Sequence, residues 1–184
     1  MVAVWLIVVL VIVAVLFVIW LLSLINRFVR YENAIDNAWA QIDVQLQRRG
    51  ELIPNLIETV KGYAAHEKTT LDAVIRARGA MLGATTRDAK MQAEGILEQA
   101  LGKLFAIAEA YPDLKANTNF LNLQDELAPT ENKIAFARQA YNDSVLRYNN
   151  AIETYPAKFF AGSRKERPML AVPEATRAVP KVQF

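Results

Sequence analysis

The sequence VAVWLIVVLVIVAVLFVIWLLSLI occupies residues 2–25 and decides how the chain is organised. It contains no charged residue and one polar side chain, Ser23, and nineteen of its residues are Val, Ile, Leu or Phe. At about 1.5 Å per residue, a helix of this length spans roughly 36 Å, more than the roughly 30 Å hydrocarbon core of a bilayer. Residues 1–25 are therefore predicted to form a transmembrane anchor.

A cleaved signal peptide is the alternative reading of this segment. No basic residue precedes the apolar run, the run is longer than a signal peptide needs, and no small-x-small cleavage site follows it. The span contains no ionisable group, so it offers no proton or ion relay. It also lacks the small-xxx-small motif that many paired transmembrane helices use. We therefore expect the segment to be retained and to act as an anchor.

The residues flanking the run predict its orientation. Arg27 and Arg30 follow it closely, and Lys or Arg near a helix end favours the cytoplasmic side. The N-terminus is therefore expected outside and the body in the cytoplasm of a bacterial cell, at the inner membrane. The aromatic residues placed to form interfacial belts are Trp5 at one end and Trp20, Phe28 and Tyr31 at the other.

Composition excludes several classes of chemistry. The 184 residues include no cysteine and one histidine, so disulfides, thiolate metal sites, a cysteine nucleophile and a multi-histidine site within one chain are impossible. The net charge is +2, but residues 157–184 carry six Lys/Arg and two Glu, so the rest of the chain is slightly acidic. Nucleic acid is not an expected partner. No cofactor and no small-molecule substrate are expected.

A heptad pattern follows the anchor over residues 26–64. Its positions are Phe28, Ile35, Trp39, Ile42, Leu46, Arg49, Ile53, Leu56, Val60 and Tyr63. This spacing predicts a helix that packs lengthwise against partners. Pro54 lies inside the pattern and would clash with the carbonyl of Gly50, but the register continues past it. We therefore predict one kinked, continuous helix.

The remaining patterns are also helical. A turn is expected at residues 66–70, a helix over 69–82, and another over 86–110 with Thr85 or Thr86 as its N-cap. The last helix is predicted to begin near Asp113 or Asn117 and to continue through Pro129 to Tyr155. The predicted fold is all-α, with the transmembrane helix followed by an antiparallel up-and-down four-helix bundle over 26–156 with long first and last helices.

Residues 157–184 form a basic tail that contains prolines. If the last helix returns towards the membrane, the tail brings Lys158, Phe159, Phe160, Arg164, Lys165 and Arg167 near the lipid headgroups. The alternative is a solvated, disordered tail, which the prolines favour beyond about residue 168. The two long helices are also expected to leave apolar seam uncovered at their ends, and self-assembly could bury it.

Arg49 occupies a seam position, where an unpaired arginine would be costly. It is predicted to pair with Glu126 or Glu131 on the last helix as a register device. It could instead reach solvent or contact a partner. The tyrosines of the last helix could form a polar strip with neighbouring asparagines or lie in the core. The packing and interaction candidates are Trp39, Arg49, Pro54, Leu56, Glu126, Pro129, Tyr141 and Tyr148.

His66-Glu67 invites comparison with the HExxH zinc motif. The second histidine would be residue 70, which is Thr70, so the motif is incomplete. A turn residue bonded to backbone or water is the simpler interpretation. No metal site and no catalytic residue are predicted.

Three long motifs resemble the LemA family of bacterial membrane proteins. They are RRGELIPNLIETVKGYAAHE at 48–67, YPDLKANTNFLNLQDELAPTENKIAFARQAYN at 111–142 and YNNAIETYP at 148–156. The resemblance implies a single-pass inner-membrane protein with an outside N-terminus and a cytoplasmic four-helix bundle. It implies no enzymatic activity. In some genomes, members of the family are encoded near a membrane zinc metalloprotease, which hints at a partner.

Three functions compete at this point. The leading hypothesis is a non-enzymatic membrane-anchored bundle that acts by association, as a homo-oligomer or as a scaffold for another membrane protein. The second is an accessory to a membrane zinc metalloprotease in protein quality control. The third is a hydrolase that uses His66 with nearby carboxylates.

Overall fold

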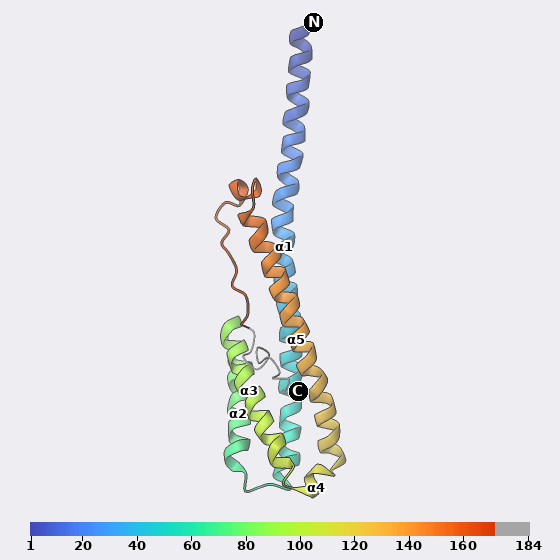
Figure 1. The fold of residues 1–184 in the computed structure, drawn as a ribbon, viewed down its shortest axis with the longest axis vertical. Helices are drawn as coiled ribbons and strands as arrows, with labels where there is room; N and C mark the ends of the chain where they lie inside the picture. Colours follow the sequence, from blue (N-terminus) through green and yellow to red (C-terminus); the bar gives the residue numbers. More distant parts are fainter. Residues whose placement is uncertain (172–184) are drawn as a thin grey trace, which may run out of the picture. The chain divides into compact units, whose positions relative to one another are not determined.

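The computed structural model describes residues 1–171, which form helices joined by short turns (Figure 1). Helix α1 spans Val2–Lys61, α2 Lys68–Gly83, α3 Arg87–Ala108, α4 Pro112–Lys115 and α5 Thr118–Glu153, and a 3-10 helix, η1, follows at Ala157–Phe160. No β-strand occurs between residues 1 and 171. The all-α prediction is confirmed. The part of the predicted tail at residues 172–184 lies outside the described residues.

The helix ends agree closely with the sequence patterns. Thr86 caps α3, because its hydroxyl accepts a hydrogen bond from the Ala89 amide at 3.2 Å. Asn117 caps α5 in the same way, accepting from the Phe120 amide at 3.0 Å. The first turn differs from the prediction. It covers residues 62–67, since α1 ends at Lys61 and α2 already begins at Lys68, and Tyr63 therefore leaves the helix and is exposed.

The chain divides into two compact units. Unit 1 consists of Met1–Ala38 and Ala140–Met169, and unit 2 consists of Trp39–Gln139 with Leu170 and Ala171, the last described residues. Both long helices contribute to both units, so these units are composed differently from the predicted segments 1–25, 26–156 and 157–184. Each unit is described by itself below.

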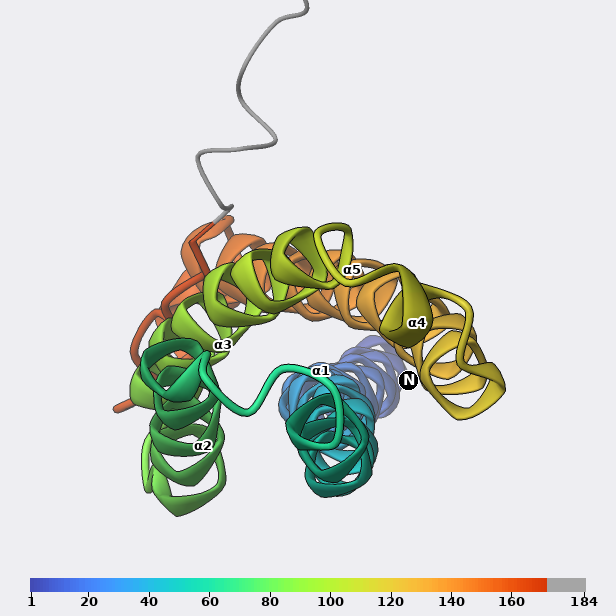
Figure 2. The same cartoon turned by 90° about the horizontal axis from the view of Figure 1, so that it is seen from below.

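Unit 2 buries the predicted heptad face of α1 together with faces of α2, α3 and α5. Helices α2 and α3 lie side by side in it (Figure 2). Its fully or nearly fully buried apolar residues include Ile42, Leu46, Ile53, Leu56, Val60, Val74, Met81, Leu97, Leu101, Leu104, Leu127 and Ile134. These residues recur at three-, four- and seven-residue steps along their helices, as expected for helices packed lengthwise.

Pro54 does not interrupt α1, as predicted, and the structure shows why this is tolerated. Proline has no amide hydrogen, so the carbonyl of Gly50, four residues earlier, loses its helical partner. The Nε of Arg78 in α2 donates a hydrogen bond to this carbonyl at 2.6 Å. A Cβ at position 50 would also approach the Leu82 side chain to 3.1 Å. Gly50 therefore permits close packing of α2 where Pro54 leaves an acceptor free.

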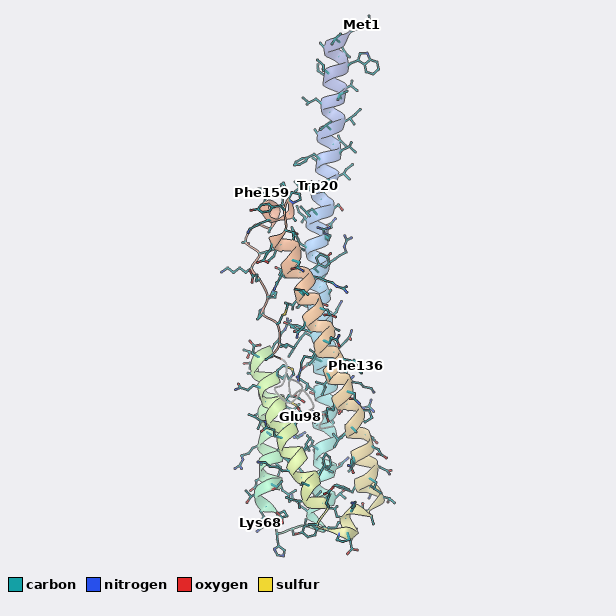
Figure 3. The ribbon with its side chains drawn as sticks, viewed as in Figure 1. Met1, Trp20, Lys68, Glu98, Phe136 and Phe159 are labelled. Carbon is teal, nitrogen blue, oxygen red and sulfur yellow. The ribbon has the colours of Figure 1, made fainter. Side chains whose placement is uncertain are left out.

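Unit 1 begins with the apolar part of α1, whose side chains are exposed from Met1 to Trp20 (Figure 3). The most apolar window has a mean hydropathy of 3.6, and none of it is buried against the rest of the chain. Among residues 1–171, α1 is the helix long and apolar enough to cross a membrane. This exposure is what the predicted anchor requires, because in water so large an apolar surface would be strongly unfavourable.

The C-terminal segment of unit 1 packs back onto its two long helices. After η1 the chain reverses at Gly162, whose φ of 63° lies in the left-handed region that favours glycine. Asn149 and Arg167 then exchange two hydrogen bonds of 2.9 Å, between the Asn149 amide group and the Arg167 backbone. The buried residues of unit 1 include Phe28, Ile35, Tyr141, Val145, Tyr148, Ile152, Ala157 and Ala161. Phe28 and Ile35 of the predicted seam are buried here, and Arg164 of the returning segment lies over the Phe28 ring.

Candidate membrane-interface site

Aromatic side chains gather where the apolar part of α1 meets η1. The Phe160 ring packs edge-on against Trp20, with ring centroids 5.6 Å apart, and against Phe17 at 6.4 Å. Trp20 and Phe17 are themselves 5.8 Å apart. Such tilted and edge-to-face contacts add specificity to apolar burial. They hold η1 against α1 at the C-terminal end of the apolar run.

Two further aromatic residues on this turn remain exposed. Tyr155 is 68% exposed and Phe159 is 76% exposed, although their rings lie only 5.1 Å apart. The ammonium group of Lys158 lies 5.8 Å from the Tyr155 ring centroid. Figure 3 shows Phe159 level with Trp20 along α1. Exposed aromatic rings beside a lysine at this level match the composition of a membrane–water interface.

The predicted interface residues fall into three groups. Trp5, Trp20, Arg27, Arg30, Lys158, Phe159 and Lys165 are exposed, and Tyr31 and Phe160 are half-buried. Phe28 is fully buried, so it is not available to lipid. The guanidinium of Arg164 lies over its ring at 5.1 Å, and Arg164 is half-buried. Phe28 and Arg164 therefore stabilise unit 1 internally, because the returning C-terminal segment places Arg164 over the Phe28 ring.

Glu32 connects three segments of unit 1. Its Oε1 accepts a hydrogen bond from Arg164 Nε at 3.0 Å and a long one from the Tyr148 hydroxyl at 3.5 Å. Burial, and next the Glu32 carboxylate, raise the pKa of Tyr148 above its ordinary value, against the opposing effect of Arg167 and Arg164. Tyr148 therefore stays protonated and can donate. Glu32 joins α1 to α5 and to the returning segment.

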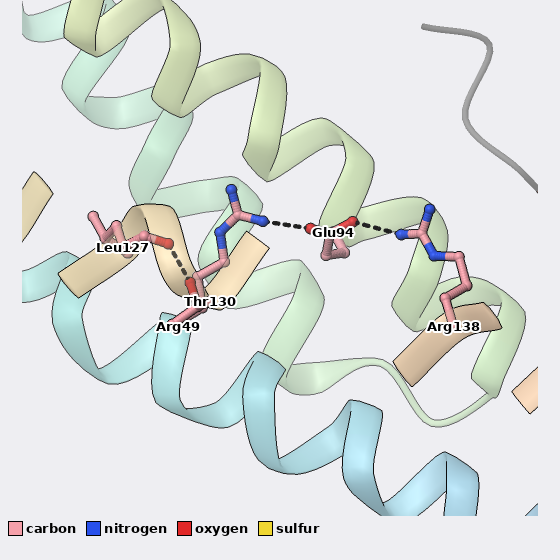
Figure 4. Close-up of polar contacts among 5 residues, drawn as sticks. All are labelled: Arg49, Glu94, Leu127, Thr130 and Arg138. Carbon is pink, nitrogen blue, oxygen red and sulfur yellow. Dashed lines mark hydrogen bonds and ion pairs between the residues drawn. The ribbon is translucent and has the colours of Figure 1, made fainter. Parts of the chain in front are cut away.

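Unit 2 contains a buried ion triad formed by Arg49, Glu94 and Arg138 (Figure 4). Arg49 Nη1 donates to Glu94 Oε1 at 2.5 Å, and Arg138 Nη2 donates to Glu94 Oε2 at 3.2 Å. The side chains of Arg49 and Glu94 are 4% and 3% exposed. The three residues come from α1, α3 and α5, so one carboxylate joins three helices.

The triad is costly because it lies out of water. Burial raises the pKa of the Glu94 carboxyl above its ordinary value, and the attraction of Arg49 and Arg138 offsets this effect only in part. The Nε atoms of both arginines are buried without an acceptor among residues 1–171. Replacing a charge network buried in this way by well-packed apolar side chains is often neutral or stabilising, so the triad is weak evidence for net stability.

The predicted partner of Arg49 is wrong. Arg49 pairs with Glu94 on α3 and not with Glu126 or Glu131 on α5, and its burial also excludes a route to solvent. Glu94 was missed, although it precedes Leu97 and Leu101 by three and seven residues and so shares their helix face. A charged residue on an apolar face was the signal that could have identified it.

Some of the other packing candidates are buried and others are exposed. Leu56, Tyr141 and Tyr148 are buried, which supports core tyrosines. Pro54, Glu126 and Pro129 are exposed, and Trp39 is half-buried with the Arg87 guanidinium 5.3 Å from its ring centroid. His66 is exposed in the turn after α1. Within residues 1–171, no three His, Asp or Glu side chains are grouped as a metal site would need.

These features define an all-α protein whose first helix is long and apolar enough to cross a membrane. The LemA family model matches residues 38–184, and the chain belongs to the LemA family. It is 26% identical to magnetosome protein MamQ of Magnetospirillum gryphiswaldense, over 79% of this chain and 63% of that protein. It is 25% identical to protein LemA of Metamycoplasma hominis, over 71% of this chain and 60% of that protein. The chain thus covers less than two thirds of the length of these relatives.

Proposed function

We propose that this chain is a single-pass, membrane-anchored helical protein that has no catalytic activity and acts by association at the bacterial inner membrane. The observation that carries the proposal is the exposed apolar part of α1, whose most apolar window is not buried inside the structure of residues 1–171. In unit 1 this segment continues without a break into the helix that packs against α5. The anchor is thus rigidly joined to the folded part of unit 1.

Membrane insertion is tested by fractionation of cells that express the full chain. We expect the protein in the membrane pellet, and we expect it to remain there after alkaline carbonate extraction, because a spanning helix is held by apolar burial and not by charge. A variant lacking residues 2–25 is expected in the soluble fraction. Release of the full chain by carbonate would contradict the anchor.

The proposed orientation places the N-terminus outside and the body in the cytoplasm. Arg27 and Arg30 are both exposed at the C-terminal end of the apolar run, which supports this orientation. The chain has no natural cysteine, so a single introduced thiol is a unique label. We expect Ala3→Cys to react with an impermeant maleimide in intact spheroplasts, and Asn122→Cys to react only after permeabilisation. The opposite pattern would reverse the topology.

Association is proposed to occur through self-assembly or scaffolding in the plane of the membrane. Family membership and the anchor support it, and Phe136 on α5 offers a large exposed apolar side chain (Figure 3). The test is the mass of the full chain in lipid nanodiscs at micromolar concentration. A multiple of the chain mass is expected for self-assembly, and a monomer would contradict it. An assembly with a membrane zinc metalloprotease would instead favour the quality-control role.

A further inference from the structure

A cleft of about 300 Å³ lies in unit 1 between α1 and the turn after α5. One wall is formed by Trp20, Ser23, Leu24 and Arg27, which share one face of α1 because they are spaced by three, one and three residues. The other wall is formed by the segment from Thr154 to Ala157. The volume of the cleft is at the lower end of the range for small-ligand sites.

The depth of this cleft follows from its place on α1. The apolar run is about 36 Å long and a hydrocarbon core is about 30 Å thick, so the last residues of the run reach the headgroup region. Trp20 lies where an interfacial aromatic residue belongs, and Arg27 lies about 10 Å further along the helix. If α1 spans the membrane as proposed above, the cleft opens beside the phosphates of one leaflet.

The side chains in the cleft suit a phosphate attached to an apolar chain. Arg27 is exposed and forms no ion pair within residues 1–171, so its planar fork of donors is free to bind two phosphate oxygens. Ser23 adds an exposed hydroxyl on the same wall. Leu24 and Trp20 provide an apolar surface on the side of the hydrocarbon core.

The turn that closes the cleft is fixed in place by other contacts. Phe160 packs against Trp20 at 5.6 Å, and the amide of Lys158 donates to the Thr154 carbonyl at 2.9 Å. Lys158 adds a positive charge beside Tyr155, and Tyr155 and Phe159 are exposed on the same turn. The cleft is therefore preformed, with Arg27 in one wall and with Lys158, Tyr155 and Phe159 on the turn that forms the other.

We infer that this cleft binds the headgroup of an anionic phospholipid, with the phosphate on Arg27 and Ser23 and the glycerol and upper acyl chain along Leu24 and Trp20. The inference deepens the proposed function, since it requires α1 to be in the bilayer. The bound lipid is a specific ligand of unit 1 and differs from the general attraction of basic residues to an anionic surface.

The test is native mass spectrometry of the full chain released from nanodiscs that contain phosphatidylcholine with phosphatidylglycerol. We expect retained phosphatidylglycerol on the wild type. Arg27→Gln is expected to reduce retention by about tenfold or more, because a hydrogen bond between charged groups is lost. The matched control is Arg30→Gln, which removes an arginine that is also exposed, three residues later and outside the cleft. It is expected to retain the lipid.

Equal loss in Arg27→Gln and Arg30→Gln would overturn the inference, since it would indicate surface charge alone. Unchanged retention in Arg27→Gln would also overturn it. Binding of soluble glycerol phosphate as tightly as of the lipid would assign the cleft to a free phosphate ester and overturn the lipid assignment. Carbonate extraction of the same samples separates these outcomes from a failure of the proposed anchor, because Arg27→Gln leaves the apolar run intact.

Discussion

Units 1 and 2 each place one carboxylate between two partners, but they do so at different depths. Glu32 in unit 1 binds Arg164 and Tyr148 at a position where its side chain is 29% exposed. Glu94 in unit 2 binds Arg49 and Arg138 with its side chain 3% exposed. Water can replace the partners of Glu32 if they are lost, but it cannot easily reach those of Glu94. Losing the partners of the carboxylate is therefore expected to cost much more free energy of unfolding in unit 2 than in unit 1.

The difference also suggests distinct roles for the two carboxylates. Glu32 lies where a returning segment must be held against two long helices that already have an apolar interface. Glu94 lies at a level where α1, α3 and α5 must keep one relative register. A displacement of one helix by a turn would leave charges buried and unpaired in unit 2. In unit 1 it would mainly expose polar groups to water.

The largest expected effect is that of Glu94→Ala. This change leaves two guanidinium groups buried without a counterion, and we expect a loss of about 3–5 kcal/mol in the free energy of unfolding. Amide hydrogen exchange of the full chain in nanodiscs measures it locally. Exchange should rise in residues 39–139 while peptides from residues 140–169 stay protected. A loss below about 1 kcal/mol would show that the triad is less buried than the structure indicates.

A sharper test replaces the whole triad by apolar side chains. The triple variant Arg49→Met, Glu94→Leu and Arg138→Met removes the charges and keeps most of the volume. We expect its unfolding free energy to lie within about 2 kcal/mol of the wild type, in either direction, since no charge is left stranded. Thermal unfolding followed by circular dichroism measures this. A loss as large as that of Glu94→Ala would contradict a role for the triad in register and favour one in stability.

The pH dependence of stability tests the environment of Glu94. Its folded pKa is raised, so the folded state binds a proton more tightly than the unfolded state, whose glutamate titrates near 4.5. The resulting stabilisation is complete below the unfolded pKa and is lost as the pH rises through the folded pKa, at most about 1.4 kcal/mol per pH unit.

Glu94→Gln is the reference for this measurement, because glutamine does not titrate. The wild type should lose stability relative to this variant as the pH rises from below 4.5. The charged groups that face Glu94 are Arg49 from α1, Glu98 from α3, and Glu131 and Arg138 from α5. An opposite slope would mean that the two arginines outweigh desolvation.

The smallest expected effect is that of Glu32→Ala in unit 1. Both Glu32 and Arg164 are partly exposed, so we expect a loss below about 1 kcal/mol. Hydrogen exchange should increase only in peptides from residues 157–169, which Arg164 helps to hold. Asn33→Ala, at the neighbouring exposed position, is the matched control. A loss as large as that of Glu94→Ala would remove the contrast between the two units.

Much of the fold could be predicted from residue periodicity. Ile42, Leu46, Ile53, Leu56 and Val60 were assigned to one face of α1 by their heptad spacing, and all are buried. Thr86 was one of two N-cap candidates because of its hydroxyl, and Asn117 was one of two predicted starts of α5. These features are local, because helical geometry alone determines which residues share a face and which amides need a cap.

The pairings between helices could not be predicted in this way. Several acidic residues were within reach of Arg49 by spacing, and the choice of Glu94 depends on which helix lies beside α1 at that level. The folding of residues 157–169 onto unit 1 was also missed. Its contacts use Asn149, Arg164 and the left-handed turn at Gly162, none of which produces a repeating pattern.

The sequence by itself determined that the chain is helical, where its longer helices begin and end to within a few residues, and that its first segment is suited to a bilayer. These properties depend on hydrophobicity and on the 3.6-residue period, which are read along one segment at a time. Only the tertiary structure decided that Glu94 neutralises Arg49 and that Phe28 is covered by Arg164. Such contacts join residues far apart in the chain, and many pairings satisfy the same pattern of charge and apolarity until packing selects one.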